Sequence, residues 1–216
     1  RLLSSPTIAS KAWVYRQYDT TVRTNTVVGP GGDAAVLRLR GTNKAIAVKI
    51  DGNGRYTYLD PRMGGRIAVC EAARNVACTG ARPMAITNCL NFGNPTKPEV
   101  YYQLREAIAG MGEACIALGT PVTGGNVSLY NESPTGAVYP TPTVGMVGLI
   151  DSLDHVTRAT FHRDGDTIVL LGENTAELGG SEYLARVHDL VAGEPPRSDP
   201  AREKALIAVL LEAIRA

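Results

Sequence analysis

Residues 121–132 read PVTGGNVSLYNE: an apolar, β-branched run leads into two glycines, and small polar residues and a carboxylate follow. Glycine lets the backbone adopt positive φ and approach a bound group closely, so that backbone N–H groups can cradle an anion. Asn126, Ser128, Asn131 and Glu132 add oxygen atoms that suit a hard cation such as Mg²⁺. The pattern predicts a phosphate and magnesium site, with a tight turn between two strands as the alternative.

A second polar segment, residues 87–95, reads TNCLNFGNP and lies between a short predicted strand and a long predicted helix. It is not a phosphate-binding loop of the Gly-Lys-Ser/Thr type, and no Gly-x-Gly-x-x-Gly fingerprint opens a helix after a strand. Two polar, glycine-containing loops separated by one amphipathic helix can face each other across a cleft. We therefore expect residues 87–95 and 121–132 to form a ligand site together.

Bulk composition excludes several function classes. The chain has 22 basic and 21 acidic residues and no basic block, so no nucleic-acid partner is expected. No apolar run reaches the length of a membrane span, so no membrane partner is expected either. The four cysteines form no C-x-x-C pair, which favours small buried side chains in a reducing, cytoplasmic location.

Histidine placement limits the chemistry of this chain. His155, His162 and His188 all follow residue 150, whereas both ligand-like segments precede it. A reaction that needs a histidine acid or base would have to take it from elsewhere, so no catalytic residue is assigned here. The start at Arg1 and the end on a helix suggest a fragment.

Hydrophobic periodicity and turn residues predict a mixed α+β architecture, because strands and helices do not alternate strictly. A boundary near residues 151–154 divides the chain into regions 1–150 and 151–216, and a glycine-bearing turn at 177–182 precedes a helix. The expected helices are 11–18, 65–79, 99–118 and 203–214, and the expected strands are 34–40, 44–50, 83–87, 121–123, 143–150 and a buried 167–171.

Several long motifs occur in one order: DGNGRY at 51–56, EAARN at 71–75, LNFGNP at 90–95 and GGNVSLYNE at 124–132. In this order they resemble phosphoribosylformylglycinamidine synthase over most of residues 8–150, and weakly as far as residues 180–182. That family contains two tandem repeats similar to aminoimidazole ribonucleotide synthetase. The chain resembles the second repeat, with its amino-terminal lobe (1–150) complete and its carboxy-terminal lobe (151–216) truncated.

The resemblance implies ATP-dependent amidation of formylglycinamide ribonucleotide in purine synthesis, with ammonia derived from glutamine. The catalytic histidine of the family belongs to the first repeat, which agrees with the lack of histidine before residue 150. The implied partners are that first repeat, a glutaminase subunit and a small accessory subunit. Because the first repeat and its histidine are absent, the isolated chain is expected to be inactive. Lobes of this family pair their sheets face to face, so the chain is also expected to form a homodimer.

Motif matching carries four family roles onto this sequence. Gly125 takes a position that contacts ATP, Asn126 one that ligates Mg²⁺, and Ser128 one that contacts the substrate. Asn88 occupies an ATP-contacting position that is usually Asp in the family. A neutral amide still forms hydrogen bonds but supplies no negative charge.

Two alternatives to this assignment stay open at this level. The chain could be a structural half of the same enzyme that binds nucleotide without catalysis and serves for dimerisation, which Asn88 favours. The other is a small-molecule kinase or selenophosphate synthetase of the same superfamily, and the motifs at 90–95 and 124–132 argue against it.

Four single residues also have two possible roles. Asp51 and Asn53 fit either a turn cap or a cleft, and Arg55 and Arg74 fit either phosphate contacts or surface ion pairs.

Overall fold

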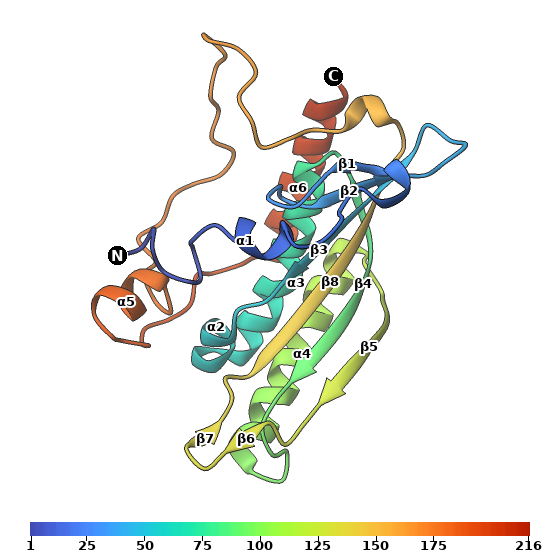
Figure 1. Ribbon diagram of the computed structural model, residues 1–216. Helices are drawn as coiled ribbons and strands as arrows, with labels where there is room; N and C mark the ends of the chain where they lie inside the picture. Colours follow the sequence, from blue (N-terminus) through green and yellow to red (C-terminus); the bar gives the residue numbers. More distant parts are fainter.

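The computed structural model describes all 216 residues. A six-stranded mixed sheet forms its centre, and the spatial order of its strands is β1-β2-β3-β8-β4-β5 (Figure 1). Neighbouring strands are antiparallel except for β4 and β5, which are parallel. The strands are β1 (Thr26–Val28), β2 (Ala35–Arg38), β3 (Ala45–Asp51), β4 (Arg82–Asn91), β5 (Val122–Ser128) and β8 (Thr141–Ile150).

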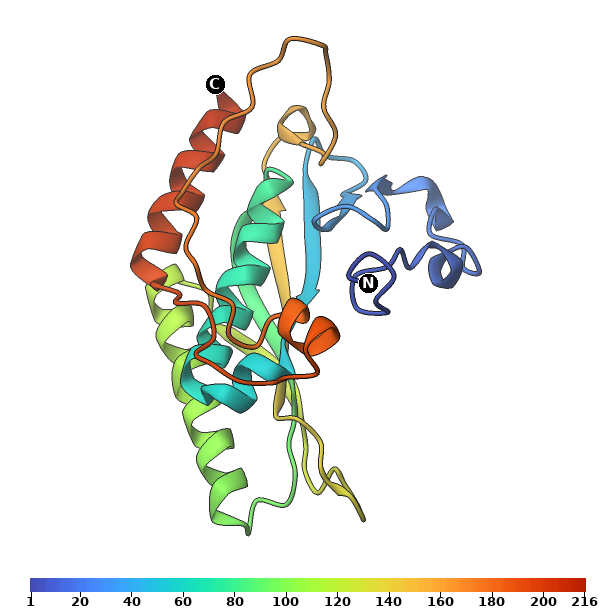
Figure 2. The ribbon, with the colours of Figure 1, turned by 90° about the vertical axis from the view of Figure 1, so that its left-hand side faces the viewer.

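Two long helices, α3 (Pro61–Cys78) and α4 (Pro98–Leu118), cover one face of the sheet, and α6 (Pro200–Arg215) packs on the outside of both (Figure 2). The backbones of α3 and α4 approach closely because glycines stand at their crossing. A Cβ at Gly65 would overlap the Ala107 carbonyl oxygen, and a Cβ at Gly110 would overlap that of Arg62. Between helices and sheet lies a core of 26 buried residues, among them the fully buried Phe92.

The opposite face of the sheet has no helix layer (Figure 2). Along β3, the buried Ala45 and Ala47 alternate with Ile46, Val48 and Ile50, as expected for a strand with two different faces. Ile50 is 68% exposed, and Val147 of the neighbouring β8 is 39% exposed. The sheet therefore presents an apolar surface, which we call the open face: Ile46, Val48, Ile50, Val147 and Leu149.

Short elements connect these layers. They are α1 (Ala12–Tyr15), η1 (Val22–Thr24), α2 (Gly54–Leu59), the hairpin strands β6 (Glu132–Ser133) and β7 (Gly136–Ala137), η2 (Leu153–His155) and α5 (Glu182–Val187). Asn53 caps α2 by accepting from the backbone N–H groups of Arg55 and Tyr56, and Asp60 caps α3 by accepting from that of Met63 at 2.9 Å. These two residues are helix caps.

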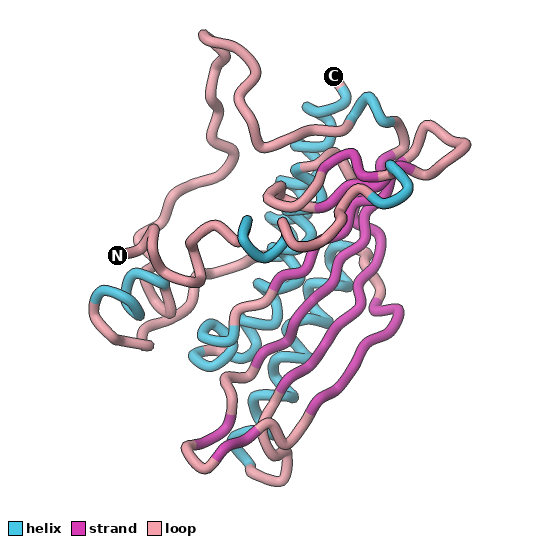
Figure 3. Tube along the Cα trace, viewed as in Figure 1, coloured by secondary structure: helices cyan, strands magenta, loops and turns pink.

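The α+β prediction is confirmed, and most predicted elements occur within a few residues of their expected bounds. Two predictions are wrong. The helix at 11–18 shrinks to the single turn α1. Residues 167–171 form no strand: they lie in the long coil between η2 and α5, where Ile168 is 77% exposed (Figure 3). An apolar run becomes a strand only where another strand completes its hydrogen bonds, and none lies beside it here.

No helix of the structure combines the length and the apolar character needed to cross a bilayer.

Candidate functional site

The two polar segments lie side by side rather than across a cleft. Residues 87–91 and 124–128, predicted as loops, belong to β4 and β5, and the parallel register pairs Asn88 with Gly125 and Asn91 with Ser128. Asn and Gly are poor strand formers, but β8 completes the backbone hydrogen bonds of β4, and α4 returns the chain to lay β5 on its other side. Tertiary pairing overrides local propensity at this point.

Asn88 and Gly125 form one close contact. A Cβ on Gly125 would overlap the Oδ1 and the carbonyl oxygen of Asn88, so the absence of a side chain at 125 leaves room for the Asn88 amide. Asn88 is half-buried, and its side chain makes no hydrogen bond within the chain. The structure thus brings together the two residues predicted to contact ATP, and it leaves the amide free for a ligand.

Asn126 lies on the other face of the sheet, because successive strand residues point to opposite sides. Its exposed side chain approaches Cys89, with Nδ2 3.7 Å from Sγ. β5 is the outermost strand, so a ligand that touches both Asn88 and Asn126 has to wrap around the free edge of the sheet. The structure therefore places the predicted metal ligand and the predicted ATP contacts on opposite sides of one edge strand.

The fit of Asn126 to Mg²⁺ is incomplete within this chain. No group of three or more His, Cys, Asp or Glu side chains is arranged to hold a metal ion. The carboxylate nearest in sequence, Glu132, is already engaged: it accepts from the Asn94 backbone N–H at 2.8 Å and pairs with Lys97 Nζ at 2.8 Å. The Lys97 ammonium first, and then the Asn94 N–H, lower the pKa of the Glu132 carboxyl.

Ser128 ends β5 and is bound within the turn that follows. Its hydroxyl donates to Asn131 Oδ1 at 3.2 Å. Asn131 Nδ2 in turn donates to the carbonyl oxygens of Ser128 at 2.9 Å and of Phe92 at 3.1 Å. The Asn131 side chain therefore fastens the end of β5 to the end of β4. The predicted substrate contact Ser128 lies at this joint with its hydroxyl occupied.

A second polar cluster, which the sequence reasoning did not assemble, lies between β3 and α3. Asp51 accepts from Asn75 Nδ2 at 2.8 Å and lies 3.7 Å from Lys49 Nζ. Burial raises the pKa of the Asp51 carboxyl. Burial, and then the charge of Asp51, raise the pKa of Glu71. The sequence pattern did not indicate that Lys49 belongs to this cluster, because a lysine in a strand is ordinarily a surface residue.

The two arginines with open assignments are ion-paired inside the chain. Arg55 pairs with Glu182 of α5, and Arg74 pairs with Glu203 of α6 at 2.5 Å. Neither pairing could be expected from helix spacing, since the partners are more than a hundred residues apart. In this structure both arginines join the carboxy-terminal helices to the α2–α3 layer.

The prediction of small, buried cysteine side chains is correct in part. Cys70 and Cys115 are buried, and burial raises the pKa of the Cys70 thiol to about 11. Cys78, at the end of α3, is exposed, so the expectation of a buried side chain is wrong there.

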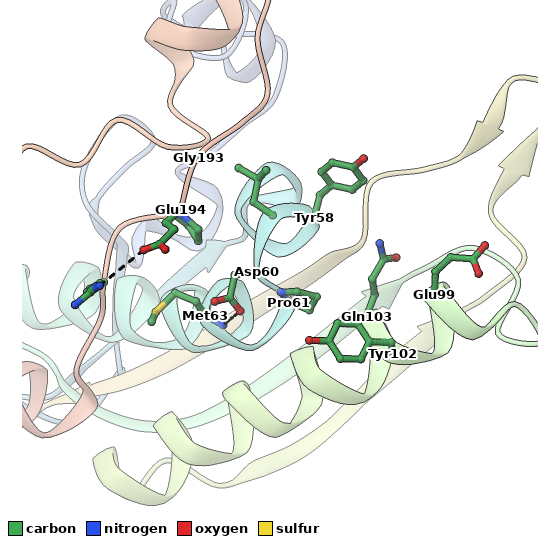
Figure 4. Close-up of a pocket in the computed structure, with 12 residues that line it drawn as sticks. Tyr58, Asp60, Pro61, Met63, Glu99, Tyr102, Gln103, Gly193 and Glu194 are labelled. Atoms are coloured by element: carbon green, nitrogen blue, oxygen red, sulfur yellow. Dashed lines mark hydrogen bonds and ion pairs between the residues drawn. The ribbon is translucent and has the colours of Figure 1, made fainter.

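One groove of the structure lies away from all four predicted site residues. It has a volume of about 610 Å³ and is lined by the α2–α3 junction, the start of α4 and residues 193–197 (Figure 4). Tyr58, Asp60 and Pro61 lie across it from Glu99, Tyr102 and Gln103. The predicted site instead occupies the exposed sheet edge, where β5 is uncovered.

Comparison with known proteins gives consistent results. Residues 31–150 match the family described as "AIR synthase related protein, N-terminal domain". The phosphoribosylformylglycinamidine synthase subunit PurL of Moorella thermoacetica is 62% identical over 215 residues, which is 100% of this chain and 29% of that protein. The chain thus spans less than a third of the length of this curated relative.

Two solved structures illustrate the likeness in fold. The structure of PurLQS from Thermotoga maritima is 35% identical, with a TM-score of 0.65, over 70% of this chain and 25% of that one. T. maritima PurL complexed with ATP is 35% identical, with a TM-score of 0.61, over 68% of this chain and 24% of that one.

Proposed function

This chain belongs to the AIR synthase related family, because residues 31–150 match the N-terminal domain of that family, and we propose that it is part of a phosphoribosylformylglycinamidine synthase. In this role it contributes nucleotide and substrate contacts to the ATP-dependent amidation of formylglycinamide ribonucleotide in purine biosynthesis. The sequence similarity to the PurL of M. thermoacetica over the whole chain supports this assignment.

One structural observation carries the proposal: the free amide of Asn88 lies against Gly125 on an uncovered sheet edge. In our proposal, Asn88 and Gly125 contact ATP, and Gly125 lets the ligand approach the backbone because it has no side chain. The structures of T. maritima PurL with ATP and with ADP support a nucleotide site in this kind of fold.

ATP supplies the phosphoryl group that activates the amide oxygen of the substrate, and ammonia derived from glutamine then displaces phosphate. Asn126 would offer one amide oxygen to Mg²⁺, and the remaining ligands would be phosphate oxygens and water. Ser128 would contact the substrate from the end of β5. No histidine lies in β4 or β5, so the acid or base of the reaction belongs to another part of the enzyme.

The proposal extends to organisation. Residues 1–150 form the amino-terminal lobe, and residues 151–216 begin a carboxy-terminal lobe. The open face is the surface that pairs with the first repeat, and with a second copy of this chain when that repeat is missing. A glutaminase subunit and a small accessory subunit complete the cytoplasmic enzyme, and the isolated chain has no synthase activity.

A second candidate function is a structural half that binds nucleotide without catalysis or serves only for pairing. Two observations favour it. Asn88 is neutral where the family usually has a carboxylate, and the side chains of Asn88 and Asn126 point to opposite faces of the sheet.

Calorimetry with ATP on the 216-residue chain, with and without Mg²⁺, separates a working nucleotide site from a half that serves only for pairing. If the chain contributes the nucleotide site, Asn88→Ala should weaken binding by about 1 kcal/mol, roughly fivefold, because one hydrogen bond is lost. Asn88→Asp should strengthen binding by restoring a charge-assisted partner, and Asn126→Ala should remove its Mg²⁺ dependence. Asn174→Ala, in the coil before α5, is the matched control. Absence of binding, or identical affinities for all variants, would favour the structural half.

Turnover is measured alongside binding. Formylglycinamide ribonucleotide, ATP and ammonia should give no product with the isolated chain and should give product with the complete protein that contains it. Product formation by the isolated chain would contradict the assignment of the acid or base to another part of the enzyme.

A further inference from the structure

The turn that follows β5 contains an unusual backbone conformation. Tyr130 has φ of +61°. This left-handed conformation suits glycine or asparagine and is unfavourable for a tyrosine. Residues held in such conformations persist only where the surrounding structure over-determines them, and they concentrate at ligand-binding positions.

The surroundings of Tyr130 hold it in this conformation. Its backbone N–H donates to the Gly93 carbonyl oxygen at 3.0 Å, and the N–H of Asn131 donates to that of Phe92 at 3.1 Å. Phe92 is fully buried, so these acceptors belong to the rigid core. The Glu132 contacts with Asn94 and Lys97 fix the next residue of the chain. Four points of attachment thus surround one strained residue.

Every other side chain of residues 128–132 has a structural partner. Ser128 and Asn131 bond to each other, Leu129 packs against the core, and Glu132 binds the 94–97 turn. Tyr130 is different: it is 63% exposed, and its hydroxyl has no hydrogen-bond partner within the chain. The strained backbone of this turn therefore holds an aromatic ring, with a hydroxyl that has no partner, at the protein surface.

Tyr130 follows the predicted site residues of β5 in the chain. Tyr130 lies two residues beyond Ser128, between β5 and the β6–β7 hairpin. This connection is at the end of the sheet where β4 and β5 both finish, far from the coil that precedes α5 (Figure 1). Because the Ser128 hydroxyl is already bonded to Asn131, the free donor at this end of β5 is the Tyr130 phenol.

We propose that Tyr130 is a substrate-binding residue, whose ring packs against the ribonucleotide substrate and whose hydroxyl forms a hydrogen bond with it. This inference rests on the proposed function and adds to it a recognition residue outside the four positions assigned above. An aromatic side chain with a polar tip matches a ligand that has an apolar ribose face next to polar groups.

Steady-state kinetics of the complete synthase that contains this chain test the proposal, with Tyr130→Ala, Tyr130→Phe and Tyr130→Gly. Tyr130→Ala should raise KM for formylglycinamide ribonucleotide about tenfold, the equivalent of 1.4 kcal/mol, and leave KM for ATP within about twofold. Tyr130→Phe should give a smaller rise, which isolates the hydroxyl. Tyr101→Ala, on the α4 surface at 56% exposure, is the matched control and should leave both constants unchanged.

Tyr130→Gly separates binding from backbone strain. Glycine relieves the left-handed conformation, so the melting temperature should equal or exceed that of Tyr130→Ala, while KM for the ribonucleotide should still rise. Unchanged KM values in an active protein would overturn the inference alone, and so would an effect on subunit assembly without an effect on KM. A wild-type protein that neither binds nor converts the ribonucleotide would overturn the proposed function, and the inference with it.

Discussion

Glu182 joins three segments that are distant in the sequence. At the start of α5, its carboxylate accepts from the Ser5 hydroxyl of the amino-terminal segment, from Arg55 of α2, and from Arg186 Nε at 2.8 Å. Replacing it by glutamine keeps the size and removes the charge. We expect Glu182→Gln to destabilise the chain at neutral pH, because two guanidinium groups lose their negatively charged acceptor.

The magnitude follows from the pKa of this carboxyl. Hydrogen bonds from Arg55 first, then from Ser5 and Arg186, lower the pKa of Glu182 from 4.5 to about 2. At 1.36 kcal/mol per unit, this shift sets a ceiling of about 3 kcal/mol. The Arg186 side chain is 46% exposed, and solvent screens a pair of this kind, so we expect about 1 kcal/mol of stabilisation. Because the folded pKa is depressed, this contribution is complete above pH 4.5 and is lost as pH falls towards 2.

Urea unfolding at pH 7 and at pH 2.5 measures this contribution for the wild type, Glu182→Gln and the control Glu194→Gln, whose side chain is 88% exposed. The loss of unfolding free energy in Glu182→Gln should be about 1 kcal/mol at pH 7 and should shrink at pH 2.5. Glu194→Gln should match the wild type at both. A Glu182→Gln effect that is equal at the two pH values, or absent at pH 7, would refute the electrostatic reasoning.

Two further predictions concern the core and the open face. Phe92→Ala should lower the unfolding free energy by about 3–5 kcal/mol in urea titration, because a fully buried ring is removed, whereas Phe161→Ala, at 85% exposure, should change it by less than about 0.5 kcal/mol. Ile50→Asp should turn a twofold dimer of the isolated chain into a monomer in sedimentation experiments without loss of helix content, since Ile50 is 68% exposed. A wild type that sediments as a monomer at tens of micromolar would contradict the pairing of open faces.

Much of the fold could be predicted from local signals. Period-3.6 apolar patterns and cap residues located α3, α4 and α6, and the turn residues around them set their ends. The strand predicted at 167–171 failed because an apolar, β-branched run states a preference for a strand but supplies no neighbour to pair with. The site residues Asn88 and Gly125 were selected by motif, but their mutual contact was not predictable, because the two residues are 37 positions apart in the sequence.

The sequence by itself determined the α+β class, the family motifs and the absence of histidine from residues 1–150. These depend on residue identity and short-range periodicity, which need no knowledge of the packed chain. Only the tertiary structure decided that the polar segments are neighbouring strands, that Asn88 and Asn126 lie on opposite faces, and that Tyr130 is held outward in a left-handed conformation. Strand order, face and backbone strain arise from contacts between distant segments, and such contacts exist only once the core has formed.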